Sequence, residues 1–197
     1  MNVELLSITP NSEELIERAC RICYNSECNP ETRDSFISGI IKRGHESVIE
    51  HASATFEITG VSRALTHQLV RCRLASYSQK SQRYCKEGQF DYVIPPSIQG
   101  LDAAYFNTTM RNLQKVYNDL IQLGIKAEDA RFVLPNACCT EIVMTMNFRE
   151  LRHFIELRAD KHAQWEIREL AKQILDILFL HAPNIFKDLK EKFDEQK

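Results

Sequence analysis

The sequence predicts a single mixed domain of the α/β or α+β class over residues 1–197, with more helix than strand. Two short stretches, residues 3–8 and 52–59, alternate apolar and polar residues, as half-buried strands do, and longer stretches repeat apolar residues at the helical period. No internal repeat, linker or low-complexity segment interrupts this order. A chain of this length can bury one substantial core and is short for two.

The first predicted elements are a strand followed by two helices. Residues 3–8 alternate weakly and indicate the strand. Asn11 or Ser12 is a suitable N-cap for the first helix, because a short polar side chain can accept a bond from a free backbone N–H. Pro30 is typical of the first turn of a helix, and Gly44 is typical of the position that ends one.

A second predicted strand leads into the most polar part of the chain. Residues 52–59 alternate, and Ser62 is placed to cap a helix that we expect to run as far as Arg71. Residues 71–84 are expected to form a loop. Residues 90–94 indicate a short strand, closed by two prolines that cannot donate to a ladder.

Long periodic stretches fill the C-terminal half of the chain. Residues 102–123 carry apolar residues three and four apart and predict a long amphipathic helix ended by Gly124. Residues 139–146 have the composition of a strand. Two further helices, 148–158 and 162–181, are expected to finish the chain.

Composition excludes several classes of protein. Hydrophobic content of 44%, charged content of 26% and a net charge of -2 argue against a membrane protein or a general nucleic-acid binder. No stretch approaches the roughly eighteen apolar residues of a membrane span. The N-terminus lacks a basic start followed by an apolar run, so we expect no secretory signal. The seven cysteines are then expected to be reduced thiols in a cytoplasmic protein.

Two patterns resemble metal sites, and neither has suitable spacing. Cys20 and Cys23 form a C-x-x-C without a second well-spaced pair, and both fall on the apolar side of a predicted helix. We interpret them as buried thiols. His45 and His51 do not match the zinc-binding H-E-x-x-H motif, so their segment is expected to supply polar contacts to a ligand. No metal is expected.

Residues 71–84 carry the clearest chemical signal. They read R-C-R-L-A-S-Y-S-Q-K-S-Q-R-Y and contain three arginines, one lysine and no acidic residue. Guanidinium groups beside hydroxyls, amides and flat rings are suited to a phosphate with an adjoining base. Because the whole chain is not basic, the segment indicates a pocket for a small phosphorylated ligand. If the preceding helix reaches Arg71, the side chains of Gln68 and Arg71 share one stripe of that helix.

A second arginine-rich pattern lies in the predicted helix 148–158. Arg158 stands three residues after Ile155 and four after Phe154, so it continues the apolar face. A buried arginine without a partner is too costly to keep, so Arg158 must meet a carboxylate, a carbonyl cluster or a ligand. Asp160 is a candidate structural partner, and this alternative stays open beside the ligand. Another face of the helix carries Arg149, Arg152, His153 and Glu156.

Several ordered motifs together resemble the flavin-dependent thymidylate synthase family. The family signature is R-H-R, seven residues and S; this chain has Arg71-Cys72-Arg73, seven residues and Ser81, followed by Q-R-Y. Further motifs that match are G-H-E-S-x-x-E-H from Gly44, A-R-x-x-L-P from Ala130, N-x-R-x-x-x-H-F-x-x-L-R from Asn147 and H-A-Q-W-E-I from His162. Ordered motifs over most of the chain are far more specific than one short pattern.

The resemblance implies a fold with an antiparallel-rich sheet and several helices, and a defined reaction. The enzyme would methylate dUMP to dTMP with 5,10-methylenetetrahydrofolate as carbon donor and NADPH, through FAD, as hydride source. It would use no nucleophile of its own. The resemblance also implies a homotetramer whose active sites are shared between subunits, with residues 79–83 serving a neighbour's site.

The resemblance also assigns the site residues. Contacts with FAD fall at Ser47, Arg71, Cys72, Arg73, Gln79, Asn147, Arg149 and His153. Contacts with dUMP fall at Gln68, Arg71, Gln79, Ser81, Gln82, Arg83, Arg131 and Arg158. Arg83 and Arg131 would hold the phosphate, and Arg158 would act as the catalytic residue by stabilising negative charge on the uracil ring. Ser81 is then a binding residue.

One position departs from the family pattern, because Cys72 replaces the central histidine of R-H-R. We interpret Cys72 as a packing residue. The alternative is a thiolate activated by Arg71 and Arg73 that attacks uracil C6. Two alternatives without catalysis also stay open: a nucleotide- or RNA-binding module that uses residues 71–84, and a structural oligomer whose arginines pair with acidic groups of neighbouring chains.

Overall fold

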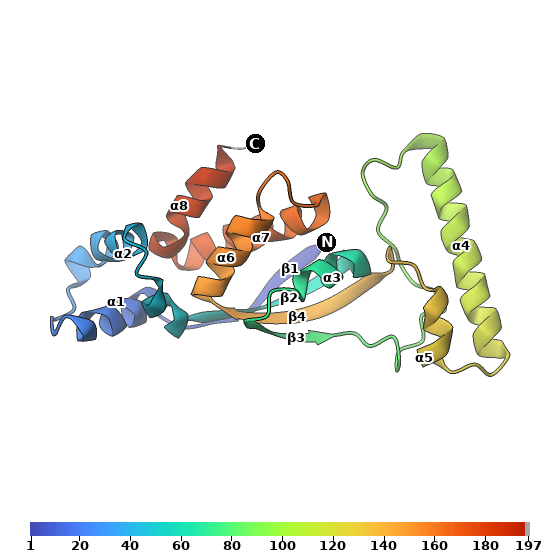
Figure 1. Ribbon diagram of the computed structural model, residues 1–197, viewed down its shortest axis with the longest axis horizontal. Helices are drawn as coiled ribbons and strands as arrows, with labels where there is room; N and C mark the ends of the chain where they lie inside the picture. The colour runs from blue at the N-terminus through green and yellow to red at the C-terminus, as the bar shows by residue number, and fades with distance from the viewer. Residues whose placement is uncertain (196–197) are drawn as a thin grey trace. The chain divides into compact units, whose positions relative to one another are not determined.

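The computed structural model describes residues 1–195 and contains a four-stranded antiparallel sheet and several helices (Figure 1). The strands are β1 (Asn2–Ile8), β2 (Ser53–Ser62), β3 (Ala75–Gln79) and β4 (Cys139–Asn147), in the order β1-β2-β4-β3. The end of β1 meets the start of β2, because Thr9 N donates to Ser53 O at 3.0 Å. The end of β4 likewise meets the start of β2, because Phe148 N donates to Ala52 O at 2.8 Å. The predicted mixed fold class is confirmed.

Helices make up more of the chain than strands do, as predicted. The α-helices are α1 (Ser12–Cys23), α2 (Arg33–Lys42), α3 (Arg63–Leu69), α4 (Gly100–Gln122), α5 (Ala127–Ala130), α6 (Phe148–Arg158), α7 (Trp165–His181) and α8 (Pro183–Asp194). Three 3₁₀ segments accompany them: η1 (Pro30–Thr32), η2 (Glu46–His51) and η3 (Arg131–Val133). Among the described helices, none is long and apolar enough to cross a membrane.

The chain folds into two compact units. The α4 unit contains Met1–Asn2, Ile58–Leu69 and Ser78–Ile142; the α6 unit contains Val3–Glu57, Val70–Tyr77 and the chain from Val143 onward. Strands β2, β3 and β4 each contribute residues to both units. The single domain over residues 1–197 stays a prediction.

The α6 unit is built around helices α6, α7 and α8, which pack on one another (Figure 1). Buried Phe148 at the start of α6 and Phe186 in α8 meet edge to face, with ring centroids 5.3 Å apart. On the strand side, Ala54 and Phe56 are buried at alternate positions of β2, as the alternating pattern predicted. This core holds α6, and therefore its polar first turn, in a defined position.

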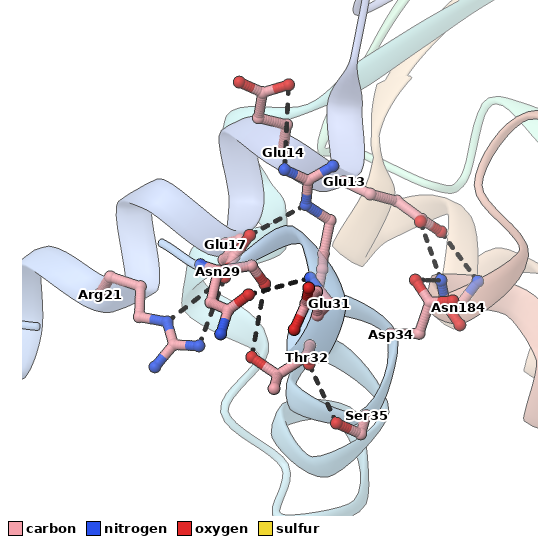
Figure 2. Close-up of polar contacts among 11 residues, drawn as sticks. Glu13, Glu14, Glu17, Arg21, Asn29, Glu31, Thr32, Asp34, Ser35 and Asn184 are labelled. Atoms are coloured by element: carbon pink, nitrogen blue, oxygen red, sulfur yellow. Dashed lines mark hydrogen bonds and ion pairs between the residues drawn. The ribbon is translucent and has the colours of Figure 1, made fainter. Parts of the chain in front are cut away.

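A buried carboxylate joins α1 to the segment that follows it in the α6 unit. Glu17 is fully buried and accepts hydrogen bonds from Arg33 Nε at 2.9 Å, from the backbone N of Asn29 at 3.0 Å and from Arg21 Nη2 at 3.3 Å. Figure 2 shows these bonds, together with the side chain of Asn29 that caps η1. Glu17 therefore fixes the connection between α1 and α2 through three separate donors.

The α4 unit has a smaller core of its own. Phe90, Met110 and Cys138 form its buried centre, and Tyr92 and Phe106 pack against them. Met110 comes from α4, whereas Phe90 comes from the irregular segment after β3. Burial raises the pKa of the Cys138 thiol to about 12, so this cysteine remains neutral and packs as an apolar side chain.

The residues predicted to begin and end helices have different outcomes. Ser62 Oγ accepts from Leu65 N at 3.0 Å and caps α3, as predicted. Gly44 and Gly124 follow α2 and α4 with positive φ angles of 70° and 85°, as predicted for residues that end helices. Asn11 is the N-cap residue of α1, but its side chain makes no capping bond because its backbone is left-handed, with φ 48°. Pro30 opens a 3₁₀ turn rather than the α-helix itself.

Several element boundaries were predicted incorrectly. The helix after Ser62 ends at Leu69, so Arg71 is not helical, and the expected loop contains strand β3. Residues 90–94 form only an isolated bridge, between Tyr92 and Cys138. Helix α7 begins at Trp165, and helices α5 and α8 were not predicted. Cys20 is buried as predicted, but Cys23 is exposed.

Candidate active site

Four of the residues assigned to FAD line two adjoining cavities of the α6 unit. One cavity, of about 540 Å³, is lined by Glu46, Glu50, Leu74, Asn147, Arg149, Glu150 and His153. The other, of about 390 Å³, contains Ser47 and shares Glu46 and Arg149 with the first. Residues 147, 149 and 153 come from the start of α6, whereas Ser47 comes from η2. Segments about a hundred residues apart in the sequence thus meet at one polar surface.

The start of α6 presents hydrogen-bond donors to this surface. Asn147 caps the helix, because its Oδ1 accepts from Glu150 N at 2.9 Å, and its amide NH₂ is then left for another acceptor. Arg149 is half exposed and pairs with Glu50 at 2.5 Å and Glu46 at 3.6 Å. The hydrogen bond to Glu50 raises the pKa of Arg149. His153 is exposed one turn further along α6. These donors suit phosphate oxygens and the polar edges of a ring system.

The glutamates that hold Arg149 were missed as site residues. Both belong to the G-H-E-S-x-x-E-H motif, which was recognised in the sequence without a role for its acidic members. They keep Arg149 over the cavity mouth, because an exposed arginine would otherwise sample many rotamers. A ligand phosphate would compete with the two carboxylates for the same guanidinium.

The R-C-R turn follows α3 and exposes its two arginines. Arg71 and Arg73 are exposed, whereas Cys72 is buried, and Tyr77 Oη donates to the Cys72 carbonyl at 3.0 Å. Burial raises the pKa of the Cys72 thiol, the charge of Glu150 raises it further, and the charge of Arg158 opposes both. The thiol is therefore protonated at neutral pH, which favours packing over nucleophilic attack. Because Arg71 lies beyond the helix, its predicted stripe with Gln68 does not exist.

We predict that Cys72→Ser keeps most of the wild-type activity. Serine preserves the size of the side chain, and a protonated thiol supplies no nucleophile that serine would lack. Initial rates of dTMP formation under saturating FAD measure this. An inactive variant, together with a dUMP adduct trapped on Cys72 of the wild type, would establish the thiolate mechanism instead.

Arg158 lies on α6 with part of its guanidinium buried. Its Nε is inaccessible to solvent and has no hydrogen-bond partner among residues 1–195. Asp160, the candidate structural partner, instead accepts from His162 Nδ1 and N at 2.7 and 2.8 Å. The charge of Arg158 lowers the pKa of the Cys72 thiol against the effect of burial. A buried donor without a partner among the described residues is available to a ligand.

A second arginine of α6, Arg152, binds an acidic side chain, although the sequence analysis put it on another face than the apolar one. Among residues 1–195 its Nε, like that of Arg158, is buried without a hydrogen-bond partner. Arg152 is buried and forms a two-bond pair with Asp188 of α8, at 2.7 and 2.6 Å, and also donates to Ile185 O. The position follows from helical phase, because Arg152 stands four residues after Phe148 and three before Ile155. The polar-face assignment is therefore wrong for Arg152, and its role is structural.

Six of the residues assigned to dUMP lie in the α4 unit. They are Gln68, Gln79, Ser81, Gln82, Arg83 and Arg131, whereas Arg71 and Arg158 lie in the α6 unit. Gln79 is the last residue of β3 rather than a loop residue, and its Nε2 donates to Thr66 Oγ1 at 2.9 Å. Ser81 Oγ accepts from Arg83 N at 3.2 Å and closes the turn that follows β3. Gln68 and Gln82 are half-buried.

Glu128 brings the two arginines assigned to the phosphate together. Its carboxylate accepts from Arg83 Nη2 and Nε at 3.1 and 3.4 Å, and its carbonyl accepts from Arg131 Nε at 3.1 Å. In both arginines the Nε atom donates to Glu128. An arginine carries five N–H donors, so each keeps donors on its terminal nitrogens for a ligand. Glu128 was missed because residues 83 and 128 are distant in the sequence.

Comparison with known proteins decides the family. The sequence model of the family described as thymidylate synthase complementing protein matches residues 4–184. The chain belongs to this family. A flavin-dependent thymidylate synthase of Geobacter sulfurreducens is 46% identical over 200 residues, which cover 95% of this chain and 86% of that protein. Two further enzymes of the same name are also similar. The enzyme of Clostridium tetani is 43% identical, and the match covers 95% of this chain and 86% of that protein. The enzyme of Thermococcus onnurineus is 41% identical, and the match covers 89% of this chain and 77% of that protein.

The family model matches residues 4–184, so the resemblance seen in the separate motifs extends over most of the chain. The matched residues include every site residue assigned above, from Ser47 to Arg158. Among residues 1–195, no group of three or more His, Cys, Asp or Glu side chains gathers as metal ligands. The polar surfaces of the two units are therefore the candidates for the chemistry.

Proposed function

We propose that this chain is a flavin-dependent thymidylate synthase, which methylates dUMP to dTMP. The carbon donor is 5,10-methylenetetrahydrofolate, and NADPH provides reducing equivalents through FAD. The observation that carries the proposal is Arg158, whose buried Nε lacks a partner among residues 1–195, on the same helix that presents Asn147, Arg149 and His153 to a cavity. The relatives bearing this name support the reaction.

The donor set of the α6 unit fits a flavin dinucleotide. Arg149, the free amide of Asn147 and the hydroxyl of Ser47 would hold its phosphates and polar edges, with Arg71, Arg73 and His153 beside them. A bound FAD supplies hydride transfer, which no amino-acid side chain provides. Cys72 offers this group at most a packing contact, because its thiol is buried and neutral.

The dUMP residues bind and orient the nucleotide. Arg83 and Arg131 hold the phosphate with the donors that Glu128 leaves free. Gln68, Ser81 and Gln82 supply further polar contacts, and Gln79 supports this turn from the end of β3. Arg158 stabilises negative charge that develops at O2 and N3 of the uracil ring, where exclusion of water strengthens the effect. No side chain has to attack the ring.

Glu128→Gln is expected to raise KM for dUMP about threefold to fivefold and to leave kcat nearly unchanged. The exchange weakens an ion pair that is half exposed, and such pairs contribute up to about 1 kcal/mol. Steady-state kinetics with varied dUMP measure the change. Asp129→Asn is the matched control, because it removes a neighbouring exposed carboxylate that does not contact Arg83. Equal effects of both variants would exclude a positioning role for Glu128.

The absorption spectrum of the purified protein tests the proposed function. We expect a yellow protein whose reduced flavin is reoxidised when dUMP and methylenetetrahydrofolate are added together. A colourless protein that cannot be reconstituted with FAD would overturn the proposal. A binding module would instead show affinity for RNA that falls steeply with salt, and a structural oligomer would show no thermal stabilisation by dUMP.

We also propose that the enzyme is a cytoplasmic homotetramer with active sites shared between subunits. The assigned residues are divided between the α4 unit and the α6 unit, and half-exposed Arg83 in the turn after β3 is accessible to another chain. Mixing two inactive variants, one in each residue set, tests the sharing. Recovery of activity in the mixture supports shared sites, and no recovery contradicts them.

A further inference from the structure

Helix α4 has an apolar face on each side. Its inner face carries Phe106, Met110, Leu113 and Tyr117, which belong to or pack beside the core of the α4 unit. Its outer face carries Leu101, Tyr105, Thr108, Asn112, Val116 and Asp119, and the C-cap residue Leu123 continues this stripe; all seven are exposed. An amphipathic helix that served only its own core would be polar on the outer side.

Three of the four apolar members of the outer face are among the most exposed hydrophobic residues of the described chain. Leu101 is 89% exposed, Tyr105 and Leu123 are each 78% exposed, and Val116 is 43% exposed. Single exposed apolar residues are ordinary on a protein surface. Four of them on one stripe of one helix indicate a surface that another helix covers.

The spacing of the outer face is symmetric about Asn112. Successive residues of the stripe from Leu101 to Asn112 are four, three and four positions apart, which makes 11 residues. The same spacing follows from Asn112 to Leu123, so the stripe consists of two 11-residue repeats. Such a repeat keeps one stripe on one side of a nearly straight helix, because 11 residues complete about three turns. A second copy of α4, run antiparallel about Asn112, therefore meets the stripe in register.

The chemistry of the facing residues is complementary in that arrangement. Leu101 faces Leu123 of the second copy, and Thr108 faces Val116, so apolar surface covers apolar surface. Tyr105 faces Asp119, a hydroxyl donor opposite a carboxylate acceptor. At the centre, two copies of Asn112 face each other, and paired amides at such a position select one register. A parallel pairing would instead put Asp119 against Asp119, where like charges repel.

We propose that the outer face of α4 is a contact between two copies of this chain, in which the helices run antiparallel across a twofold axis at Asn112. The contact is isologous, so each pair of facing residues occurs twice. It rests on the homotetramer of the proposed function and names one of its surfaces. It does not depend on the reaction.

Charge exchange at the two ends of the stripe tests the proposal. Leu101→Lys alone and Leu123→Glu alone are each expected to halve the mass of the assembly in solution, because each puts an unpaired charge against a leucine of the other copy. The double variant is expected to restore the wild-type mass, since each introduced lysine then faces an introduced glutamate of the other copy. Analytical ultracentrifugation measures the mass. Leu180→Lys on α7 is the control, because Leu180 is 79% exposed outside this stripe and should leave the mass unchanged.

The outcomes separate this proposal from the rest of the function. If both single variants keep the wild-type mass, α4 does not form a contact between subunits, and a homotetramer would have to form through another surface. If the single variants halve the mass and the double variant does not restore it, the antiparallel register is wrong. A monomeric wild type would overturn the tetramer and this contact together, whereas its FAD content would still report on the reaction. Circular dichroism confirms that each variant is folded.

Discussion

Arg158→Met is expected to lower kcat by about 100-fold to 1,000-fold. Removal of one donor that stabilises transition-state charge typically has an effect of this size. The fall in activity should come without a loss of stability, because the buried Nε of Arg158 has no partner in the described part of the chain that the exchange would leave unpaired. An apolar side chain at such a position is neutral or stabilising. Single-turnover oxidation of the reduced flavin measures the first effect, and thermal unfolding the second.

Arg152→Met on the same helix is the matched comparison. It removes an arginine whose two terminal nitrogens bind Asp188, so it should lower the melting temperature while the folded fraction keeps its kcat. The assignment of roles would be contradicted if Arg158→Met destabilised the enzyme and its activity fell only in proportion to the folded fraction. In that case Arg158 would be structural.

Glu17→Ala is expected to lower the free energy of unfolding by about 3 kcal/mol. The exchange leaves two arginines and the backbone N of Asn29 without their acceptor, and breaking a buried ion pair from one side is strongly destabilising. Urea denaturation measures the change. Glu14→Ala is the matched control on the same helix, because Glu14 meets Arg33 only at 4.0 Å and is 60% exposed. It should cost less than about 1 kcal/mol. Equal losses would show that burial of Glu17 is unimportant.

The contribution of Glu17 should also depend on pH. Burial raises the pKa of this carboxyl, but the hydrogen bonds from Arg33, Asn29 and Arg21 prevail and leave it below its ordinary value of 4.5. As the pH falls, Glu17 therefore takes up a proton in the unfolded chain at a higher pH than in the folded chain. The stabilisation is present above pH 4.5 and is lost as the pH falls through the lowered folded pKa. Wild type and Glu17→Ala should thus become more alike in stability below pH 4.5.

Local patterns were sufficient for much of this protein. Strand β2 alternates because one face packs on a core, and this alternation is visible in the sequence. Strand β1 alternates only weakly and buries none of its residues fully, and β4 was predicted from its composition. Helix α6 was predicted with its observed bounds, because its apolar period starts directly after a capping asparagine. The ordered motifs identified the family, since they depend on residue identity alone. Motif matching also named the candidate site residues, but it could not show which of them form hydrogen bonds or ion pairs with other side chains.

Tertiary structure decided what depends on distant partners. Strand β3 lacks a local apolar pattern and exists because Lys80 N and its neighbours bond to β4, some sixty residues later in the chain. The pairs Arg83–Glu128 and Arg149–Glu50 join residues 45 and 99 positions apart, so spacing along the chain carries no trace of them. The sequence by itself determined the family, the periodic elements and the residue types of the site. Only the folded chain decided that Arg152 binds Asp188, whereas the buried Nε of Arg158 has no partner among residues 1–195, because a charge is satisfied by whatever lies beside it in space.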